Sequence, residues 1–345
     1  MNETLRTVIV GFGRIADRLA DDEQMARHFR FATHAQALRA VVGFHWDAVV
    51  DPDEEALRRA RERWGIEIAV RDVADLSDTR FDVAVLATPP DRRIAVLDRL
   101  PGLRAIVVEK PLGTSRAETE RFAALVRERG LVVQVNYWRR FDGGSSAVRG
   151  LLPVVGRPQA ACGLYGNGLR NNGSHLIDLV RMALGEIAEA RALGPARPVS
   201  EAPIAGDVDI PFALTLRDAT IVTALTLDFH HYREVGLDIW YETGRIAFMQ
   251  ESLSIRHFPV AEHRALVGAR EIASDRPRDL TVVAGDALRG LYIDLHQALR
   301  HDRATNSGLG NALANERIVE AIVESARRGG AALACGPGAM SADAD

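Results

Sequence analysis

The chain has 345 residues, about twice the length of a typical domain, so we expect two domains or one domain with a large elaboration. Hydrophobic residues make up 47% and charged residues 26%, as in soluble globular proteins, and no apolar run approaches the roughly 18 residues of a membrane span. The formal net charge of -4, without a block rich in Lys and Arg, excludes a general attraction to nucleic acid or anionic lipid. We therefore expect a small-molecule partner.

The two cysteines, Cys162 and Cys335, are too few for a disulfide framework or a four-thiolate metal site. No histidine pair combines the spacing of metal ligands with nearby cysteines or carboxylates, so the sequence predicts no metal. The first residues lead directly into a predicted strand without the basic, apolar and small-residue segments of a targeting signal. We therefore expect a cytoplasmic protein.

Residues 1 to about 135 alternate short β-branched runs with amphipathic stretches rich in Arg and Glu, a pattern typical of βα units around a parallel sheet. Helices are predicted from Asp51 to Trp64 and from Ser115 to Gly130, the second beginning with a capping box of Ser115 and Glu118. The predicted strands are Thr7–Val10, Trp46–Val50, Glu67–Val70, Phe81–Leu86, Ala105–Glu109 and Leu131–Val135.

After about residue 150 the pattern changes to short alternating strands with few helices between them, which predicts an antiparallel sheet. Two helices flank this sheet, Ser174–Leu184 and Asn311–Arg328, and each ends before a glycine. The predicted strands are Phe212–Leu216, Ile221–Leu227, Leu237–Tyr241 and Arg245–Met249.

The first strand leads into a GxGxxA pattern, Gly11–Ala16, at a strand-to-helix turn. The first glycine permits a tight turn, the second lets the backbone approach a pyrophosphate, and the following helix N-terminus offers free N–H groups. The alternative is a flexible turn, but the position directly after the first strand favours dinucleotide binding. The predicted cofactor residues of this turn are Gly11, Phe12, Gly13, Arg14 and Ile15.

Asp51, after the second strand, is the predicted ligand of the adenosine ribose hydroxyls, and it would repel a 2′-phosphate. This favours NAD(H) over NADP(H). The distance of 38 residues from Gly13 exceeds the usual spacing, so the first crossover must contain an insertion, which we place at Asp21 to Phe44. Asp47 is the competing candidate but lies inside the strand, and Asp51 can also cap the next helix.

The 43 Lys and Arg residues include a single lysine, Lys110. A lysine retained where other cationic positions are arginine suggests a task that a guanidinium group cannot perform, such as releasing a proton. The alternative is that the single lysine stands at this position by chance. Lys110 follows the fifth strand, as Thr88 follows the fourth, and open parallel sheets bind ligands at these strand ends. Thr88, Pro89, Pro90, Glu109 and Lys110 are therefore predicted near the cofactor, against the alternative of a surface Glu–Lys pair.

These motifs occur in a recognisable order: GxGxxA, AVVDP, ATPP, VVEKPL, NYWRRF, GSHLIDL and ALANERIVEAIVESARRG. In this order the chain resembles the Gfo/Idh/MocA oxidoreductase family over nearly its whole length. The resemblance implies an α/β protein whose N-terminal Rossmann doubly wound parallel sheet is followed by an α/β domain with an open, mostly antiparallel sheet. We expect a dinucleotide-binding domain over 1–135, a substrate-binding and oligomerisation domain over 136–330, and a frayed tail over 331–345.

The resemblance assigns roles to individual residues. Lys110 corresponds to the family lysine that orients the reacting hydroxyl and shares in proton transfer, and His175 to the acid/base histidine of a DxGxH pattern. The aspartate of that pattern is replaced by Asn171, whose amide can orient a hydroxyl but cannot relay a proton. His175 stands in the first turn of its predicted helix, where the dipole favours neutral imidazole, and Asp178 could orient the ring.

Two further polar groups are predicted to contact the substrate. One lies beside His175 and contains Arg170, Asn171 and Asn172, which suit a hydroxyl-rich or phosphorylated ligand or form an ordinary loop. The other follows the sixth strand, where arginines would either bind a phosphate or carboxylate or cap the sheet. Its predicted substrate residues are Tyr137, Arg139 and Arg140.

The sequence therefore predicts an NAD-dependent oxidoreductase that transfers a hydride between nicotinamide and a carbinol or carbonyl carbon of a sugar, cyclitol or nucleotide-sugar derivative. The catalytic residues would be Lys110, His175 and Asn171, and the protein would form a homodimer or homotetramer through its second sheet. Two alternatives are a redox-neutral NAD-using enzyme of the epimerase or glycosidase type and a non-catalytic dinucleotide-binding regulator.

Overall fold

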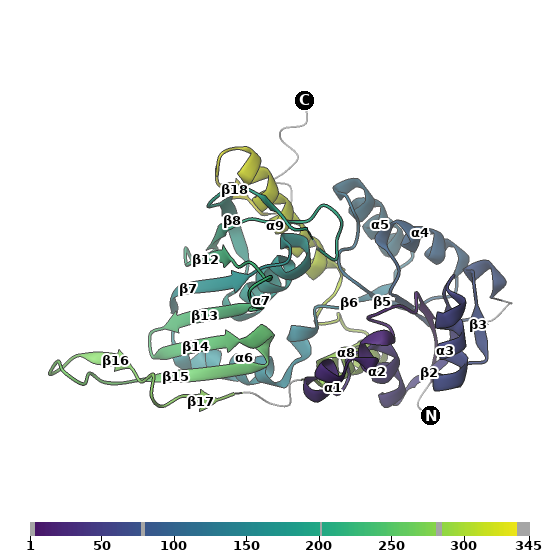
Figure 1. Ribbon diagram of the computed structural model, residues 1–345, viewed down its shortest axis with the longest axis horizontal. Coiled ribbons are helices and arrows are strands. Elements are labelled where there is room, and N and C mark those ends of the chain that lie inside the picture. Colours follow the sequence, from purple (N-terminus) through teal and green to yellow (C-terminus); the bar gives the residue numbers. More distant parts are fainter. Residues whose placement is uncertain (1–3, 77–79, 201, 281–284, 337–345) are drawn as a thin grey trace. The chain divides into compact units, whose positions relative to one another are not determined.

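The computed structural model describes residues 4–76, 80–200, 202–280 and 285–336 (Figure 1). The chain forms two compact units. The first comprises Met1–Phe141 and Gly285–Ala312, and the second comprises Asp142–Ala284 and Leu313–Asp345. This division differs from the predicted ranges because the segment that begins at Gly285 returns to the first unit.

The first unit is built on a parallel sheet with the order β3-β2-β1-β4-β5-β6 in the described residues. The strand order reverses beside β1, which lies between β2 and β4, and ligands of open α/β sheets bind at such a reversal. The predicted Rossmann arrangement is confirmed. The strands are β1 (Leu5–Val10), β2 (Phe44–Val50), β3 (Ile68–Val70), β4 (Val83–Leu86), β5 (Ala105–Val108) and β6 (Val132–Val135).

Helices connect these strands, and capping residues mark several of their ends. The helix α3 begins after Asp53, which accepts the Glu55 N–H, and ends at Gly65 in the left-handed conformation. The predicted capping box at α5 is half correct, because Ser115 accepts the Glu118 N–H while the Glu118 carboxylate binds Thr114. The bounds are α3 (Glu54–Trp64), α4 (Pro90–Arg99) and α5 (Arg116–Glu128).

The first crossover contains no long helix after the glycine motif, which corrects our expectation. The Asp17 N–H closes a turn on the Gly13 carbonyl at 3.0 Å, and short helical segments follow. They are the 3-10 helix η1 (Arg18–Asp21), α1 (Glu23–His28) and α2 (His34–Ala40), and the last two lie within the predicted insertion.

The helix α8 (Ala287–His301) completes the first unit, and the sequence analysis did not predict it. It lies side by side with α2 (Figure 1), and its Leu291, Tyr292 and Leu295 side chains are fully buried in the same core as Ile9 of β1. An apolar helical face does not reveal which sheet it covers, so a segment 150 residues beyond the sixth strand could not be assigned to this core from sequence.

The second unit contains a mixed sheet with the path β16-β15-β14-β13-β7-β12-β11-β8-β18 in its described residues. The pairing of β7 with β12 is parallel and the other pairings on this path are antiparallel, as expected. The main strands are β7 (Pro158–Tyr165), β8 (Ile187–Ala192), β11 (Phe212–Leu216), β12 (Ile221–Thr226), β13 (Gly236–Tyr241), β14 (Gly244–Met249) and β15 (Ser254–Glu262). The shorter ones are β16 (Arg270–Ile272), β17 (Arg278–Asp279), which pairs with β15, and β18 (Leu333–Ala334), while β9 (Arg197–Pro198) pairs with β10 (Val208–Asp209).

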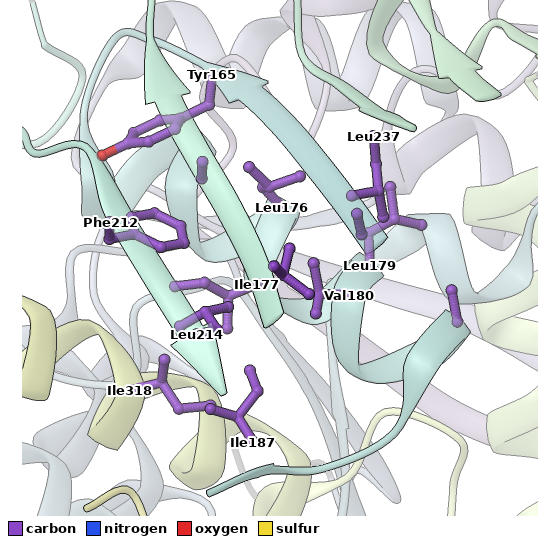
Figure 2. Close-up of a cluster of buried hydrophobic side chains, with 14 of the residues drawn as sticks. Tyr165, Leu176, Ile177, Leu179, Val180, Ile187, Phe212, Leu214, Leu237 and Ile318 are labelled. Atoms are coloured by element: carbon purple, nitrogen blue, oxygen red, sulfur yellow. The ribbon is translucent and has the colours of Figure 1, made fainter. Parts of the chain in front are cut away.

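One face of this sheet is covered by helices. Figure 2 shows Leu176 and Val180 of α7 packed among side chains of the sheet, including Phe212 and Leu237. On β12 the side chains alternate, so that Ile221 and Leu225 point away from this core and are 58% and 48% exposed. The helices of this unit are α6 (Gly143–Val155), α7 (Ser174–Leu184) and the larger part of α9 (Leu309–Arg327).

The described residues contain neither a candidate membrane-spanning helix nor a candidate metal cluster. No helix there is both long and apolar enough to cross a membrane. No group of three or more His, Cys, Asp or Glu side chains in that part of the chain is arranged to hold a metal ion.

Candidate active site

The glycine turn closes the carboxyl end of β1. Gly11 has a φ of +87°, and a Cβ atom there would lie 2.7 Å from the carbonyl oxygen of Ala87 after β4. A side chain at Gly11 is therefore excluded both by backbone conformation and by contact. A Cβ atom on Gly13 would meet nothing within 4 Å, so the second glycine borders open space. This geometry fits a pyrophosphate approaching the backbone, as the motif predicts.

Asp51 joins this turn to the end of β2. Its carboxylate accepts the Phe12 N–H at 2.5 Å and the Asp53 N–H at 2.8 Å. The side chain of Phe12 is buried, which fixes the direction of the turn. The competing candidate, Asp47, lies within β2 and binds Arg6 at 3.0 Å. Of the two acids, Asp51 is the one at the carboxyl edge of the sheet beside the glycine turn.

The remaining predicted residues of the turn have different environments. Arg14 is exposed, and the carbonyl of Ile15 accepts the N–H of His34 in the first turn of α2. The turn is therefore anchored to α2 on one side and to the connection after β4 on the other.

Arg93 connects the segments that follow β4 and β5. This arginine is only 2% exposed, and its guanidinium donates to the carbonyl of Thr88 at 3.0 Å and to that of Pro111 at 2.5 Å. Sequence reasoning missed Arg93, because one arginine among 42 gives no signal of burial. Thr88 Oγ1 is buried and has no hydrogen-bond partner among the described residues, so it can bind a ligand at this edge. Pro89 precedes α4 and Pro90 begins it.

Glu109 is partly buried in the first unit. Its Oε1 atom binds His34 Nε2 at 2.9 Å and accepts from Asn136 Nδ2 at 2.6 Å, and its side chain is 17% exposed. The Glu109 carboxylate is therefore hydrogen-bonded to two side chains from other segments of the first unit. Burial acts to raise the pKa of Glu109, but the hydrogen bonds from His34 and Asn136, together with the nearby positive charges, hold this pKa below its usual value. The positive charge of Lys110 also lowers it.

The segment after β6 contains the predicted residues Tyr137, Arg139 and Arg140. Tyr137 is 1% exposed, and Arg139 is buried with its guanidinium 4.5 Å from the centre of the Trp138 ring. Arg140 donates to Asn311 at 2.8 Å. These contacts anchor the segment within the first unit, and a substrate role for these residues stays a prediction.

In the second unit a π-helix, η4 (Leu169–Gly173), contains Arg170, Asn171 and Asn172. Wide helical turns of this kind are frequent at functional sites. The side-chain amides of Asn171 and Asn172 donate to the carbonyls of Asn167 and Gly166, at 3.1 Å and 2.8 Å, so both asparagines shape the loop that contains them.

Asp207 and Asp209 support this π-helix, and neither was predicted. Asp207 accepts the N–H groups of Arg170 and Asn171 at 3.0 Å and 2.9 Å, and Asp209 accepts that of Gly168 at 2.8 Å. Burial raises the pKa of Asp209, and the charge of Asp207 adds to this effect although the Gly168 hydrogen bond opposes it. The sequence contains no signal for this pairing, because Asp207 lies 37 residues beyond Arg170.

His175 lies in the first turn of α7, but this helix has no free N-terminus. Gly173 has right-handed helical backbone angles, and the Ser174 N–H binds the carbonyl of Leu169. The π-helix therefore leads into α7 without a break, and the dipole argument for a neutral His175 does not apply. Asp178 is buried and accepts a hydrogen bond from Asn315 at 2.9 Å.

Comparison with known proteins agrees with this geometry. Residues 5–137 match the model of the Gfo/Idh/MocA oxidoreductase family, which has an NAD-binding Rossmann fold. The match covers the strands of the parallel sheet in the first unit. Lys110 is part of the first unit, whereas Asn171 and His175 are part of the second.

Relatives of known activity match only in part. Trans-1,2-dihydrobenzene-1,2-diol dehydrogenase of Macaca fuscata fuscata is 34% identical over 76 residues, which cover 22% of this chain and 23% of that protein. The match thus spans less than a quarter of the relative.

Solved structures match over nearly the whole chain. Levoglucosan dehydrogenase in complex with NADH and levoglucosan is similar with a TM-score of 0.74 and 17% identity, over 97% of this chain and 100% of that chain. An NADPH-dependent oxidoreductase, so described for Desulfitobacterium hafniense, has a TM-score of 0.76 and 15% identity, over 97% and 99% of the two chains. At these identities the similarity shows the fold.

Proposed function

We propose that this protein is an NAD-dependent oxidoreductase that transfers a hydride between nicotinamide and a carbinol or carbonyl carbon of a sugar, cyclitol or nucleotide-sugar derivative. The observation that carries the proposal is the glycine turn of β1, which is closed at Gly11, open at Gly13 and tied to Asp51. NAD would supply the hydride acceptor and its reduced form the donor.

The cofactor would lie along the carboxyl ends of β1, β2, β4 and β5. The Asp51 carboxylate, already oriented by two N–H groups, would accept from the ribose hydroxyls and repel a 2′-phosphate, which favours NAD(H) over NADP(H). Thr88 Oγ1 offers an unsatisfied polar atom to the same ligand. The proposed cofactor residues are Gly11, Phe12, Gly13, Arg14, Ile15, Asp51, Thr88, Pro89, Pro90, Glu109 and Lys110.

The proposed catalytic residues divide the handling of the reacting hydroxyl. The Lys110 ammonium would donate a hydrogen bond to the reacting oxygen, and His175 would accept or return its proton. The Asn171 amide would orient a substrate hydroxyl without relaying a proton. The further substrate residues would be Tyr137, Arg139, Arg140, Arg170 and Asn172.

The same proposal extends to assembly and location. The exposed Ile221 and Leu225 on the uncovered face of β12 support a homodimer or homotetramer formed through this sheet. We place the protein in the cytoplasm. The first domain would bind the dinucleotide, and the second would bind the substrate and the partner subunit.

A fluorescence titration with NADH and NADPH tests the cofactor assignment. We expect NADH to bind at least about tenfold more tightly than NADPH, and Asp51→Asn to remove most of that preference. Asp47→Asn is the matched control, because it changes an acid of the same strand that binds Arg6, and it should leave the preference unchanged. Failure of both nucleotides to bind the wild-type protein would refute the assignment.

A second experiment addresses the reaction. Production of NADH is followed with levoglucosan, a dihydrodiol, inositols and hexoses as candidate substrates. Asn171, in the position of the family aspartate, favours one alternative, which requires analysis of the products and of the cofactor released from denatured protein. Tightly held NAD that co-purifies, with substrate converted but no net NADH formed, would indicate a redox-neutral enzyme. Binding of NADH without any turnover would favour a regulator.

A further inference from the structure

A chain of buried polar side chains ends at the residue before Lys110. The Tyr292 hydroxyl of α8 lies 2.8 Å from His34 Nδ1, and His34 Nε2 of α2 lies 2.9 Å from Glu109 Oε1. His34 and Tyr292 are both fully buried. Asn136, directly after β6, donates to the same Glu109 oxygen. Thus α2, α8 and the segment after β6 meet at one carboxylate.

The hydrogen bonds of this chain have a defined direction. Burial, together with the charge of Glu109, keeps the pKa of Tyr292 well above its usual value, so the hydroxyl stays protonated. The ionised Glu109 carboxylate can only accept, and therefore His34 Nε2 donates to it. In a neutral imidazole Nδ1 is then the acceptor for the Tyr292 hydroxyl. Each of these three side chains thus has a hydrogen-bond partner within the chain.

Lys110 is fixed by contacts on both sides along the chain. On its N-terminal side the Glu109 side chain is bound to His34 and Asn136, and on its C-terminal side the Pro111 carbonyl accepts from the buried Arg93. Among the described residues, the titratable side chains of His34 on α2 and of Lys110 act on Glu109, and Glu109 in turn acts on Tyr292 of α8.

We propose that His34, together with Asn136, is a positioning residue that holds an ionised Glu109 carboxylate beside Lys110, so that Lys110 remains an ammonium group and serves as a hydrogen-bond donor. The role of this ammonium in catalysis rests on the proposed function. His34 belongs to the inserted crossover, outside all the motifs on which the sequence analysis relied.

The physical reason is the cost of a buried charge. A carboxylate removed from water without hydrogen-bond donors takes up a proton, and the donors of His34 and Asn136 prevent this for Glu109. Loss of the Glu109 charge would remove the opposite charge that favours the protonated form of Lys110. His34 would therefore act on Lys110 through Glu109 without touching the substrate.

The composition of the chain allows a direct test. Lys110 is the only lysine, so protein grown with ¹³C,¹⁵N-lysine gives one side-chain Cε resonance, and its pH titration reports the pKa of Lys110 alone. The measurement needs no substrate and no turnover.

Three variants are compared with the wild-type protein. Glu109→Gln removes the charge, and we expect it to lower the pKa of Lys110 by about one unit or more. His34→Leu removes the donor and should lower this pKa by a smaller amount. His34→Gln restores an N–H donor near the position of Nε2 and should recover most of the wild-type value.

A matched control is His45→Gln, which alters an exposed histidine of β2 that pairs with Asp47 at 3.2 Å, and it should leave the Lys110 titration unchanged. Thermal unfolding confirms that each variant is folded. A Lys110 pKa that stays within about 0.2 units of the wild-type value in both Glu109→Gln and His34→Leu would overturn the inference. An equal shift in His34→Gln and His34→Leu would also overturn the donor role.

NADH titration of the same samples separates this inference from the proposed function. If the wild-type protein binds neither NADH nor NADPH, the proposed function fails. The changes in the pKa of Lys110 still test whether His34 acts on Lys110 through Glu109. If NADH binds and the shifts are absent, only the inference fails.

Discussion

The two compact units stabilise partly buried carboxylates near their candidate residues by different means. In the first unit Glu109 accepts from two side chains, His34 and Asn136, and feels the charge of Lys110. In the second unit Asp209 accepts a backbone N–H and has the like charge of Asp207 beside it. As a result, the pKa of Glu109 is lowered and that of Asp209 is raised. In the first unit, side-chain donors offset the cost of removing the Glu109 charge from water. In the second unit, the carboxylates of Asp207 and Asp209 mainly order the loop and π-helix around residues 168–171.

The largest effect is expected at the glycine turn of the first unit. Gly11→Ala adds a Cβ that would lie 2.7 Å from a carbonyl oxygen at a positive φ, and we expect the free energy of unfolding to fall by about 3 kcal/mol. NADH binding should be lost. Gly65→Ala is the control: Gly65 also has a positive φ but no atom within 4 Å, so the cost should be about 1 kcal/mol. Chemical denaturation measures both, and equal losses would contradict the contact argument.

Arg93 should come next. Arg93→Met removes three hydrogen bonds to the carbonyls of Thr88 and Pro111, which would remain buried, and should lower the free energy of unfolding by about 2 kcal/mol. The neighbouring Arg92 is exposed, so Arg92→Met should cost less than about 0.5 kcal/mol. Denaturation curves of the two variants test this contrast. If their losses were the same, Arg93 would not hold the two segments together.

The corresponding support in the second unit should have a smaller effect when it is changed conservatively. Asp207→Asn keeps one oxygen acceptor for the N–H groups of Arg170 and Asn171, and we expect a loss of about 1 kcal/mol. Asp207→Ala leaves both N–H groups without this acceptor and should cost more. The same denaturation assay applies, and a neutral Asp207→Ala would show that the π-helix does not depend on this residue.

The smallest and most diagnostic effect concerns pH. Because the pKa of Glu109 is lowered by folding, its ionisation stabilises the fold above the unfolded-state value, and this contribution is lost as pH falls through the folded-state pKa. Glu109→Gln should therefore be destabilised at pH 7 and approach the wild type in acid. The ionisation of Asp209 has the opposite effect on stability, because the raised pKa of this residue shows that folding favours its protonated form.

Asp209→Asn should accordingly equal or exceed the wild-type stability at pH 7, and its advantage should disappear below the usual carboxyl pKa of about 4. Unfolding free energies of both variants between pH 3.5 and 7 give the comparison. If Glu109→Gln and Asp209→Asn changed the free energy of unfolding at pH 7 in the same direction, the distinction between the two units would be refuted.

Much of the secondary structure follows from local sequence. The strand Val83–Leu86 is recognisable because parallel strands buried on both faces are continuous apolar runs, and Ser174–Leu184 matches the predicted helix. The glycine motif and Asp51 could be found because their chemistry depends on short spacings and strand ends. The domain limits were harder to predict from the sequence, because α8 contributes to a core whose strands lie far away in sequence.

The sequence by itself thus determined the six strands of the first sheet, the glycine turn and the identity of the single lysine. Only the tertiary structure decided which side chains surround that lysine. His34 and Glu109 are 75 residues apart, Tyr292 lies 258 residues beyond His34, and Asp207 is 37 residues from Arg170. The physical reason is that propensity and hydrophobic periodicity act over one or two helical turns, whereas hydrogen bonds to buried charges are formed between segments that only the packed fold brings together.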